Sequence, residues 1–219
     1  MPAIVFDMDG VLIDSERLVL KAWRHVGDEL GLPDLSGILH KALGTTHAHT
    51  ATLFADAFGR DFDYLGFRDR VRAYFYDVLT VNGAPLKAGV TELLFWLKSE
   101  GWRIGLASST REAGVRLNME RTGLISYFDV LIGGDMLKAS KPAPDIYLMA
   151  CARLGAAPHT AYAVEDSYNG IRSAHAAGMQ ALMVPDMVPA DEEMRTLARA
   201  VLPDLLAVRD WLVKQEQNA

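Results

Sequence analysis

The feature that most constrains the fold of this chain is a regular alternation of helices and short apolar strands, which begins near Pro85. Each expected helix ends at a glycine, the usual residue after the last turn of a helix. Strands that alternate with helices form parallel sheets, because each helix carries the chain back to the start of the next strand. The pattern predicts helices over residues 89–100, 111–122, 144–154 and 168–177, and strands over 102–107, 128–132, 160–164 and 179–184.

The segment from residue 15 to residue 83 has a purely helical pattern. Apolar residues recur there at helical spacing, and no run alternates as a strand would. We therefore expect an α/β protein with a Rossmann-like, doubly wound parallel sheet as its core domain, and an inserted all-helical domain. The core domain would comprise residues 1–14 and 84–219, and the inserted domain residues 15–83, with helices over 15–32, 45–58 and 66–80. The tail, 190–213, is expected to form two helices around a short segment at 201–203.

Composition excludes several classes of protein. The chain of 219 residues has a net charge of −6 and no strongly basic run, so no nucleic-acid partner is expected. We expect no membrane span, because no apolar run approaches the roughly 20 residues that one needs, and no signal peptide. The single cysteine, Cys151, is expected to be a small core residue, which favours a reducing, cytoplasmic location. Phe95 and Trp96 are also expected in the core.

Two aspartates directly follow the first apolar strand, residues 3–6, and they point to chemistry. Asp7 and Asp9 stand two positions apart, and Gly10 after them suits a tight turn. A core strand does not need anions at its end, whereas open α/β sheets bind ligands outside the carboxyl ends of their strands. The structural alternative is a pair of aspartates that cap the next segment.

Polar motifs follow three other expected strands in the same way. They are Ser108-Ser109-Thr110, Lys138-Ala139-Ser140-Lys141-Pro142 and Glu165-Asp166. With Asp7-x-Asp9-Gly10 and Asp14-Ser15-Glu16, in this order and spacing, the chain resembles the haloacid dehalogenase (HAD) superfamily over nearly its whole length. It is most similar to the phosphatases and β-phosphoglucomutases that carry a helical cap after the first strand, so residues 15–83 are expected to be that cap.

The resemblance implies a role for each core motif. Asp7 would attack phosphorus and form an aspartyl-phosphate, and Asp9 would protonate the leaving group and later activate water. Ser108 and the Ser109 amide would bind the phosphoryl group at the start of a helix. Lys141 would neutralise both the phosphate and the nucleophile.

The resemblance also implies a Mg²⁺ site. Its protein ligands would be Asp7, the backbone carbonyl of Asp9, and Asp166, while Glu165 would act through water or by orienting its loop. Several carboxylates and a phosphate dianion repel one another unless a cation lies between them.

Structural alternatives stay open for some of these residues. Ser109 or Thr110 could merely cap the helix over 111–122, and Ser167 could cap the helix that follows it. Lys138 competes with Lys141 as the phosphate cation, but the Lys-Pro pair favours Lys141, and Lys138 is expected to be solvated.

We expect a Mg²⁺-dependent hydrolase of a small phosphate monoester, such as a sugar phosphate, that is a monomer or weak dimer. One alternative is a phosphosugar mutase, but Val19 and His47 stand where β-phosphoglucomutases carry a histidine and a cap-loop arginine. A catalytically silent metabolite-binding protein is the non-enzyme alternative. Candidate substrate contacts in the cap are Gly44, Thr45, His47 and Arg70.

Overall fold

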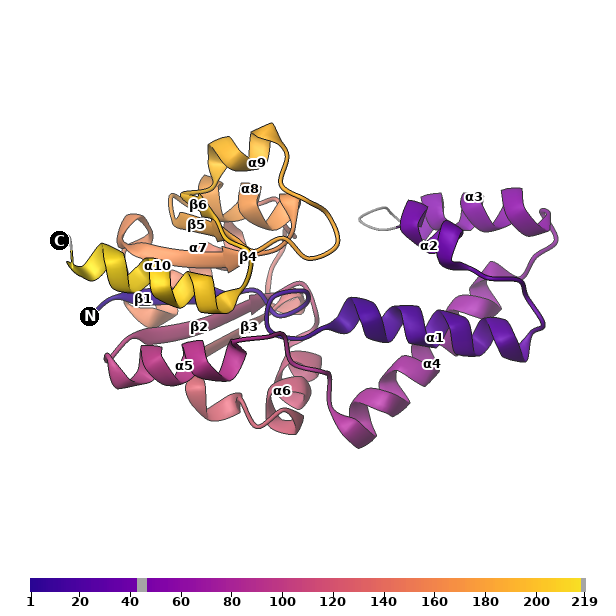
Figure 1. Cartoon of the computed structure of the whole chain (residues 1–219), viewed down its shortest axis with the longest axis horizontal. Coiled ribbons are helices and arrows are strands. Elements are labelled where there is room, and N and C mark those ends of the chain that lie inside the picture. The colour runs from indigo at the N-terminus through magenta and orange to yellow at the C-terminus, as the bar shows by residue number, and fades with distance from the viewer. Residues whose placement is uncertain (43–46, 218–219) are drawn as a thin grey trace. The chain divides into compact units, whose positions relative to one another are not determined.

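The computed structural model describes residues 1–42 and 47–217, and the chain divides into two compact units (Figure 1). The first unit comprises Met1–Asp14 and Ala84–Ala219, and the second comprises Ser15–Gly83. Among the described residues, strands occur only in the first unit, while the second is built from helices.

The first unit is built on a six-stranded sheet of order β3-β2-β1-β4-β5-β6, in which every neighbouring pair is parallel. The strands are β1 (Ala3–Phe6), β2 (Arg103–Ser108), β3 (Val130–Gly133), β4 (Ala161–Glu165), β5 (Gln180–Met183) and β6 (Ala200–Val201). β1 lies between β2 and β4, and all four of its residues are buried. The expected α/β, Rossmann-like fold class is confirmed.

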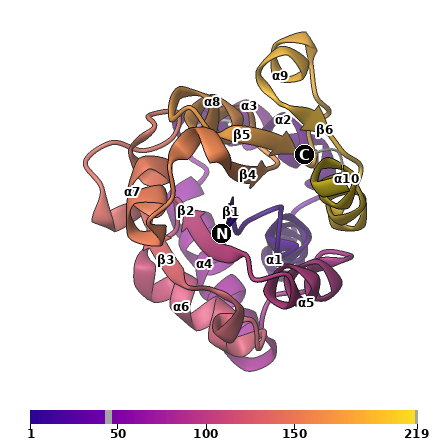
Figure 2. The same cartoon turned by 90° about the vertical axis from the view of Figure 1, so that its left-hand side faces the viewer.

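Helices cover both faces of this sheet (Figure 2). α7 and α8 lie on one side, where they pack against the β1 residues Ala3 and Val5, and α5 and α10 lie on the other side. The α-helices of this unit are α5 (Val90–Ser99), α6 (Glu112–Arg121), α7 (Asp145–Leu154), α8 (Tyr168–Ala176), α9 (Glu192–Leu197) and α10 (Leu205–Gln217). Short 3-10 turns are η1 (Ile125–Tyr127), η2 (Gly134–Met136) and η3 (Pro158–Thr160).

The predicted elements of this unit lie within about two residues of the observed ones, except in the tail, where α10 ends at Gln217 and not near residue 213. The tail segment at 201–203 was expected only as a connection, but its start belongs to β6, which pairs with β5 through Leu182 and Ala200. A strand of two residues is too short to show any periodicity. Phe95 was expected in the core, and this was wrong, because its side chain is 67% exposed on α5. Cys151 is buried, as expected.

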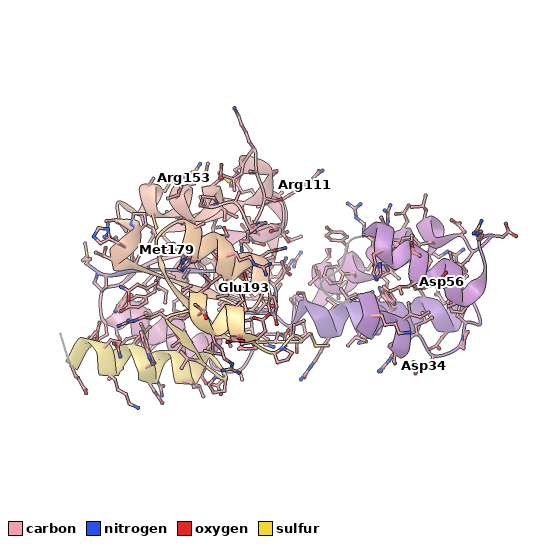
Figure 3. All side chains as sticks on the ribbon, turned by 90° about the horizontal axis from the view of Figure 1, so that it is seen from above. Asp34, Asp56, Arg111, Arg153, Met179 and Glu193 are labelled. Carbon is pink, nitrogen blue, oxygen red and sulfur yellow. The ribbon has the colours of Figure 1, made fainter. Side chains whose placement is uncertain are left out.

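The second unit is a helical domain around an aromatic core. Its helices are α1 (Ser15–Glu29), α2 (Ser36–Ala42), α3 (His47–Phe58) and α4 (Tyr64–Asn82). The Trp23 ring lies edge-on to Phe54 and Phe67, with centroid distances of 5.2 and 5.6 Å. α2 was not expected, since seven residues give too little periodicity. Asp34, labelled in Figure 3, precedes it and accepts hydrogen bonds from the Ser36 N–H and hydroxyl, at 3.1 and 2.7 Å.

The segments of the first unit that lead into and out of the second unit are hydrogen-bonded to each other. The Asp14 N–H donates to the Pro85 carbonyl at 2.8 Å, and the Lys87 N–H donates to the Leu12 carbonyl at 3.0 Å. Outgoing and returning segments are therefore fixed to each other. In the part of the chain that the structure describes, no helix has both the length and the apolar character of a membrane span.

Candidate active site

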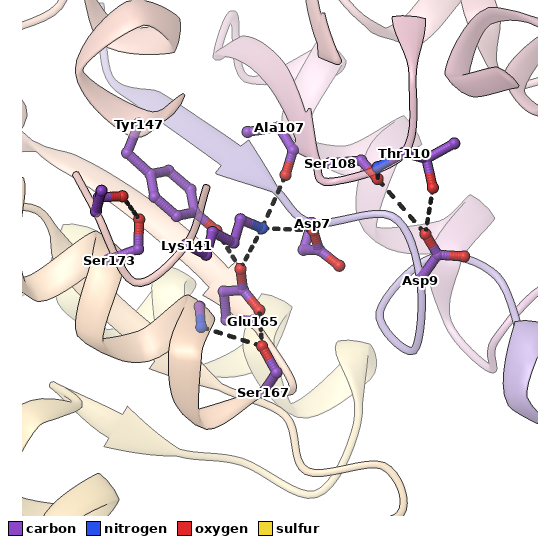
Figure 4. A network of polar contacts seen from close by, with 12 residues as sticks. Asp7, Asp9, Ala107, Ser108, Thr110, Lys141, Tyr147, Glu165, Ser167 and Ser173 are labelled. Carbon is purple, nitrogen blue, oxygen red and sulfur yellow. Dashed lines mark hydrogen bonds and ion pairs between the residues drawn. The ribbon is translucent and has the colours of Figure 1, made fainter. Parts of the chain in front are cut away.

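The carboxyl ends of three adjacent strands bring the predicted core motifs together. Asp7 follows β1 directly, Ser108 is the last residue of β2, and Glu165 is the last residue of β4. Because β1 lies between β2 and β4 in a parallel sheet, these ends lie at one edge. Lys141 reaches the same place from the segment between β3 and α7 (Figure 4).

Lys141 is the centre of a buried polar network. Its Nζ atom lies 2.6 Å from Asp7 Oδ1 and 2.6 Å from Glu165 Oε1, and it also donates to the Ala107 carbonyl at 3.0 Å. The Lys141 side chain is only 7% exposed and that of Glu165 is 0% exposed. Three acceptors match the three donors of an ammonium group, which is the condition for burying this charge.

Glu165 is held from three sides. Its Oε1 atom accepts hydrogen bonds from Lys141 and from the Tyr147 hydroxyl, the latter at 2.6 Å, and its Oε2 atom accepts from the Ser167 hydroxyl at 3.2 Å. The Ser167 hydroxyl also accepts from the Gly170 N–H at 3.1 Å and so caps α8, as the structural alternative had suggested. Glu165 thus connects the lysine to the start of α8.

Two glycines let acidic side chains approach the backbone closely. Gly10 has φ +77°, and a Cβ atom there would lie 2.3 Å from Asp166 Oδ2. A Cβ atom at Gly170 would lie 1.9 Å from the Glu165 carboxyl carbon. Any larger residue at Gly10 would displace the Asp166 carboxylate, and one at Gly170 would displace the Glu165 carboxylate.

The electrostatics of this edge favour a cation. Burial, together with the charges of Glu165 and Asp9, raises the pKa of Asp7 to about 7 in spite of the adjacent Lys141. Burial and the Glu165 and Asp7 carboxylates raise the pKa of Asp166 well above its usual range. Burial alone would lower the pKa of Lys141, but Asp7 and Glu165 raise it. One ammonium group therefore does not balance the carboxylates around it.

The donor set suits a magnesium ion. Asp7, Glu165 and Asp166 each offer a carboxylate oxygen, and these oxygens lie within 4.8 Å of one another. Mg²⁺ prefers oxygen ligands and keeps several waters, so it needs only a few protein carboxylates. Asp7 and Asp166 fit this role best, because both oxygens of Glu165 already accept hydrogen bonds.

The Asp9 side chain belongs to a second, smaller group of contacts (Figure 4). Its Oδ2 atom accepts a hydrogen bond from Thr110 Oγ1 at 3.1 Å and lies 3.5 Å from Ser108 Oγ, at the limit of hydrogen bonding. The Thr110 N–H donates to Ser108 Oγ at 3.1 Å. Asp9 is therefore oriented by the motif that ends β2.

The structure does not support helix capping by Ser109 or Thr110. α6 begins at Glu112, and the Glu112 N–H donates to the Asp135 carboxylate at 2.8 Å, so a remote aspartate caps this helix. Ser109 is exposed next to the buried Ser108. Lys138 is exposed as well, as expected.

The predicted cap contacts are only partly described. Gly44 and Thr45 lie outside the described residues, and for His47 only the backbone is described, at the start of α3. Arg70 is exposed on α4. Their expected contact with substrate stays a prediction.

Three residues around the site were not singled out from the sequence. Tyr147 lies in an apolar helical run that is typical of a core, and Thr110 was considered only as a cap. Asp186, which follows β5, pairs with Lys87 at 2.6 Å, and its charge adds to the larger effect of burial on Asp166. For Tyr147 and Asp186, the one sequence signal is a polar residue beside an apolar run.

Comparison with known proteins identifies the family. The profile of haloacid dehalogenase-like hydrolases matches residues 4–184, which is most of the chain. The protein therefore belongs to the haloacid dehalogenase-like hydrolase family.

Similar proteins agree with this assignment. The chain is 33% identical over 184 residues to the phosphorylated carbohydrates phosphatase of Thermotoga maritima, covering 82% of this chain and 83% of that protein. It is 30% identical to the β-phosphoglucomutase of Bacillus subtilis, covering 84% and 83%. A solved HAD-family hydrolase from Deinococcus radiodurans, with bound phosphate and sodium, has a TM-score of 0.81 and 27% identity, covering 98% of this chain and 96% of that one. The expected enzyme class, a HAD-type phosphatase, is confirmed.

Proposed function

We propose that the protein hydrolyses a small phosphate monoester, such as a sugar phosphate, through an aspartyl-phosphate on Asp7 and with Mg²⁺ as cofactor. The observation that carries this proposal is the 2.6 Å contact between the Lys141 ammonium and the Asp7 carboxylate at the carboxyl edge of the sheet. A buried carboxylate paired with a cation at the ligand-binding edge is suited to attack on an anionic phosphoryl group. The Thermotoga relative, named for phosphorylated carbohydrates, supports the substrate class.

In the first half-reaction, an Asp7 oxygen attacks phosphorus and the bond to the leaving oxygen breaks. The Asp9 side chain begins this step protonated and transfers its proton to the departing alkoxide, which leaves as the alcohol. Thr110 and Ser108 orient the Asp9 carboxyl group for this transfer. The Lys141 ammonium offsets the charge that accumulates between the nucleophile and the phosphoryl oxygens.

In the second half-reaction, water attacks the phosphorus of the aspartyl-phosphate. Asp9, now a carboxylate, accepts a proton from this water, and Asp7 departs as a carboxylate. Inorganic phosphate leaves, and both aspartates regain their starting protonation states.

The magnesium site of this proposal consists of Asp7 and Asp166, with the Asp9 backbone carbonyl as the third protein ligand. Bound Mg²⁺ would offset phosphate charge beside the nucleophile. Glu165 is assigned to Lys141 instead, because its oxygens are hydrogen-bonded to the lysine, a tyrosine and a serine. We propose further that the Ser15–Gly83 unit acts as the cap and selects the substrate.

A panel of phosphorylated metabolites tests this function, with released phosphate as the readout in the presence and absence of Mg²⁺. Asp7→Asn serves as the matched variant, since it preserves shape and removes the nucleophile. We expect Mg²⁺-dependent turnover of at least one sugar phosphate and none by Asp7→Asn. Substantial turnover by Asp7→Asn would exclude the aspartyl-phosphate route.

A phosphosugar mutase is the second candidate, and the similarity to the Bacillus β-phosphoglucomutase favours keeping it. A mutase needs a bisphosphate to prime the enzyme and returns an isomer rather than free phosphate. The same panel distinguishes the two activities when hexose 1-phosphates are supplied with a trace of bisphosphate. Isomer formation without phosphate release would replace hydrolysis by the mutase reaction.

A further inference from the structure

We infer that Tyr147 is a positioning residue of the phosphoryl-transfer site, and that its hydroxyl holds Glu165 so that the Lys141 ammonium stays directed at Asp7. This inference rests on the proposed function. It adds a residue whose hydroxyl donates to Glu165 and that acts on the nucleophile through the lysine.

The first support is the geometry of the Glu165 carboxylate. The Tyr147 hydroxyl and the Lys141 ammonium donate to the same oxygen, Oε1, each at 2.6 Å (Figure 4). Hydrogen bonds to an ionised acceptor are the strong ones, and both are short. The tyrosine therefore limits rotation of the carboxylate that the lysine contacts.

The second support is the rigidity of the tyrosine. Tyr147 is 0% exposed in the core formed by α7, α8 and the sheet. Its backbone N–H donates to the Pro144 carbonyl at 3.1 Å, in the first turn of α7. Its ring centroid lies 5.1 Å from Lys141 Nζ, so the ring also faces the ammonium.

The third support is the way in which the lysine segment is held. The Ser173 hydroxyl of α8 donates to the Ala143 carbonyl at 2.6 Å, which fixes the backbone two residues beyond Lys141. The Lys141 side chain is long, so a fixed backbone does not fix the ammonium. The Glu165–Tyr147 pair constrains the tip of the side chain, together with the Ala107 carbonyl.

The test compares Tyr147→Phe with Tyr162→Phe, using an aryl phosphate as substrate and saturating Mg²⁺. Tyr147→Phe removes the hydroxyl and keeps the ring that faces the lysine. Tyr162 is a partly buried tyrosine of β4 whose ring packs near Trp102, so it is a matched control away from the site. Thermal unfolding of both variants shows whether the fold is retained.

We expect Tyr147→Phe to lower kcat about tenfold and to change KM less than about twofold, because the lost bond supports the transition state more than binding. Tyr162→Phe should match the wild type. In a Glu165→Gln background, the effect of Tyr147→Phe on kcat should shrink to below about threefold. The tyrosine hydroxyl then faces a neutral amide and not a carboxylate that pairs with Lys141.

Two results would overturn the inference. One is a Tyr147→Phe variant with wild-type kcat at saturating Mg²⁺; if that variant also requires more Mg²⁺, the tyrosine acts at the metal instead. The other is a full tenfold effect that persists beside Glu165→Gln. Asp7→Asn is assayed in parallel: if it stays active, the proposed function fails, and if it is inactive, a normal Tyr147→Phe refutes only the role of Tyr147.

Discussion

Thr110 donates a hydrogen bond from Oγ1 to Asp9 Oδ2 at 3.1 Å, and so joins the loop that follows β1 to the motif at the end of β2. Thr110→Val keeps the shape of the side chain and removes this donor. We predict that kcat falls about three- to tenfold for substrates with alcohol leaving groups, because the acid is less well oriented. Aryl phosphates, which need little protonation, should be affected less. Steady-state kinetics on both substrate types measures this difference.

Thr122→Val is the matched control, since the Thr122 hydroxyl donates only within its own helix region, to the Asn118 carbonyl at 2.7 Å and the Met119 carbonyl at 3.3 Å. It should leave both substrate types unaffected. Equal losses for alcohol and aryl leaving groups in Thr110→Val would count against its role beside the acid.

Gly10→Ala should disable the proposed Mg²⁺ site. The new Cβ atom would lie 2.3 Å from Asp166 Oδ2, so Asp166 must move. Gly31→Ala is the matched control, because Gly31 has a similar positive φ of +64° but nothing within 4 Å of the added atom. Both variants should lose about 1–2 kcal/mol of stability from left-handed backbone strain. Calorimetric Mg²⁺ titration should show lost affinity in Gly10→Ala alone, and equal affinity in the two variants would contradict the placement of the ion.

Most of the site residues that the sequence predicts have the same position relative to a strand. Asp7, Ser108 and Glu165 each stand at the carboxyl end of a strand, and parallel topology brings such ends together whatever the details of packing. Lys141 was found through its Lys-Pro motif. The catalytic and metal roles assigned to these residues stay predictions.

The contacts that were missed depend on tertiary placement. Tyr147 sits in an apolar helical run, and only the position of Glu165 gives its hydroxyl a partner. Asp135 caps a helix that begins 23 residues earlier in the chain, which no local pattern can indicate. Likewise β6 exists because β5 offers it an edge, not because two residues prefer a strand.

The metal-free protein should lose stability as pH rises. The pKa of Asp7 is raised from 3.8 to about 7 in the folded protein, so the folded state holds this proton more tightly than the unfolded state does. The stabilisation from Asp7 is therefore complete at low pH, where this residue is protonated in both states. It is lost progressively as the pH rises from about 4 to about 7. Thermal unfolding in EDTA across this range measures the decline. Asp7→Asn should flatten it.

Mg²⁺ should reverse this trend, because the ion binds the deprotonated carboxylates and displaces the proton. The Mg²⁺-induced rise in the unfolding midpoint should therefore grow as pH increases towards and beyond about 7. A stabilisation by Mg²⁺ that is the same at every pH would show that Asp7 is not among its ligands.

Cys151 should be inert in the folded enzyme. Its side chain is 1% exposed, and burial raises the pKa of its thiol from 9.0 to about 11, so the reactive thiolate is rarer at pH 8 than in an unfolded chain. Thiol-reagent labelling should be slow in native buffer and fast in denaturant. Rapid labelling of the native protein would contradict the burial of this residue.

The central claim is that Asp7 carries the phosphoryl group and Asp9 serves as the acid and base. Asp9→Asn, given Mg²⁺ and an aryl phosphate with a good leaving group, should still form the aspartyl-phosphate but should hydrolyse it slowly, because asparagine cannot activate water. Intact-protein mass spectrometry after rapid quenching should show a species heavier by one phosphoryl group, absent from the Asp7→Asn/Asp9→Asn double variant. If no such species accumulates, and both half-reactions slow equally, Asp9 is not the acid–base residue. If the species persists in the double variant, Asp7 is not the nucleophile.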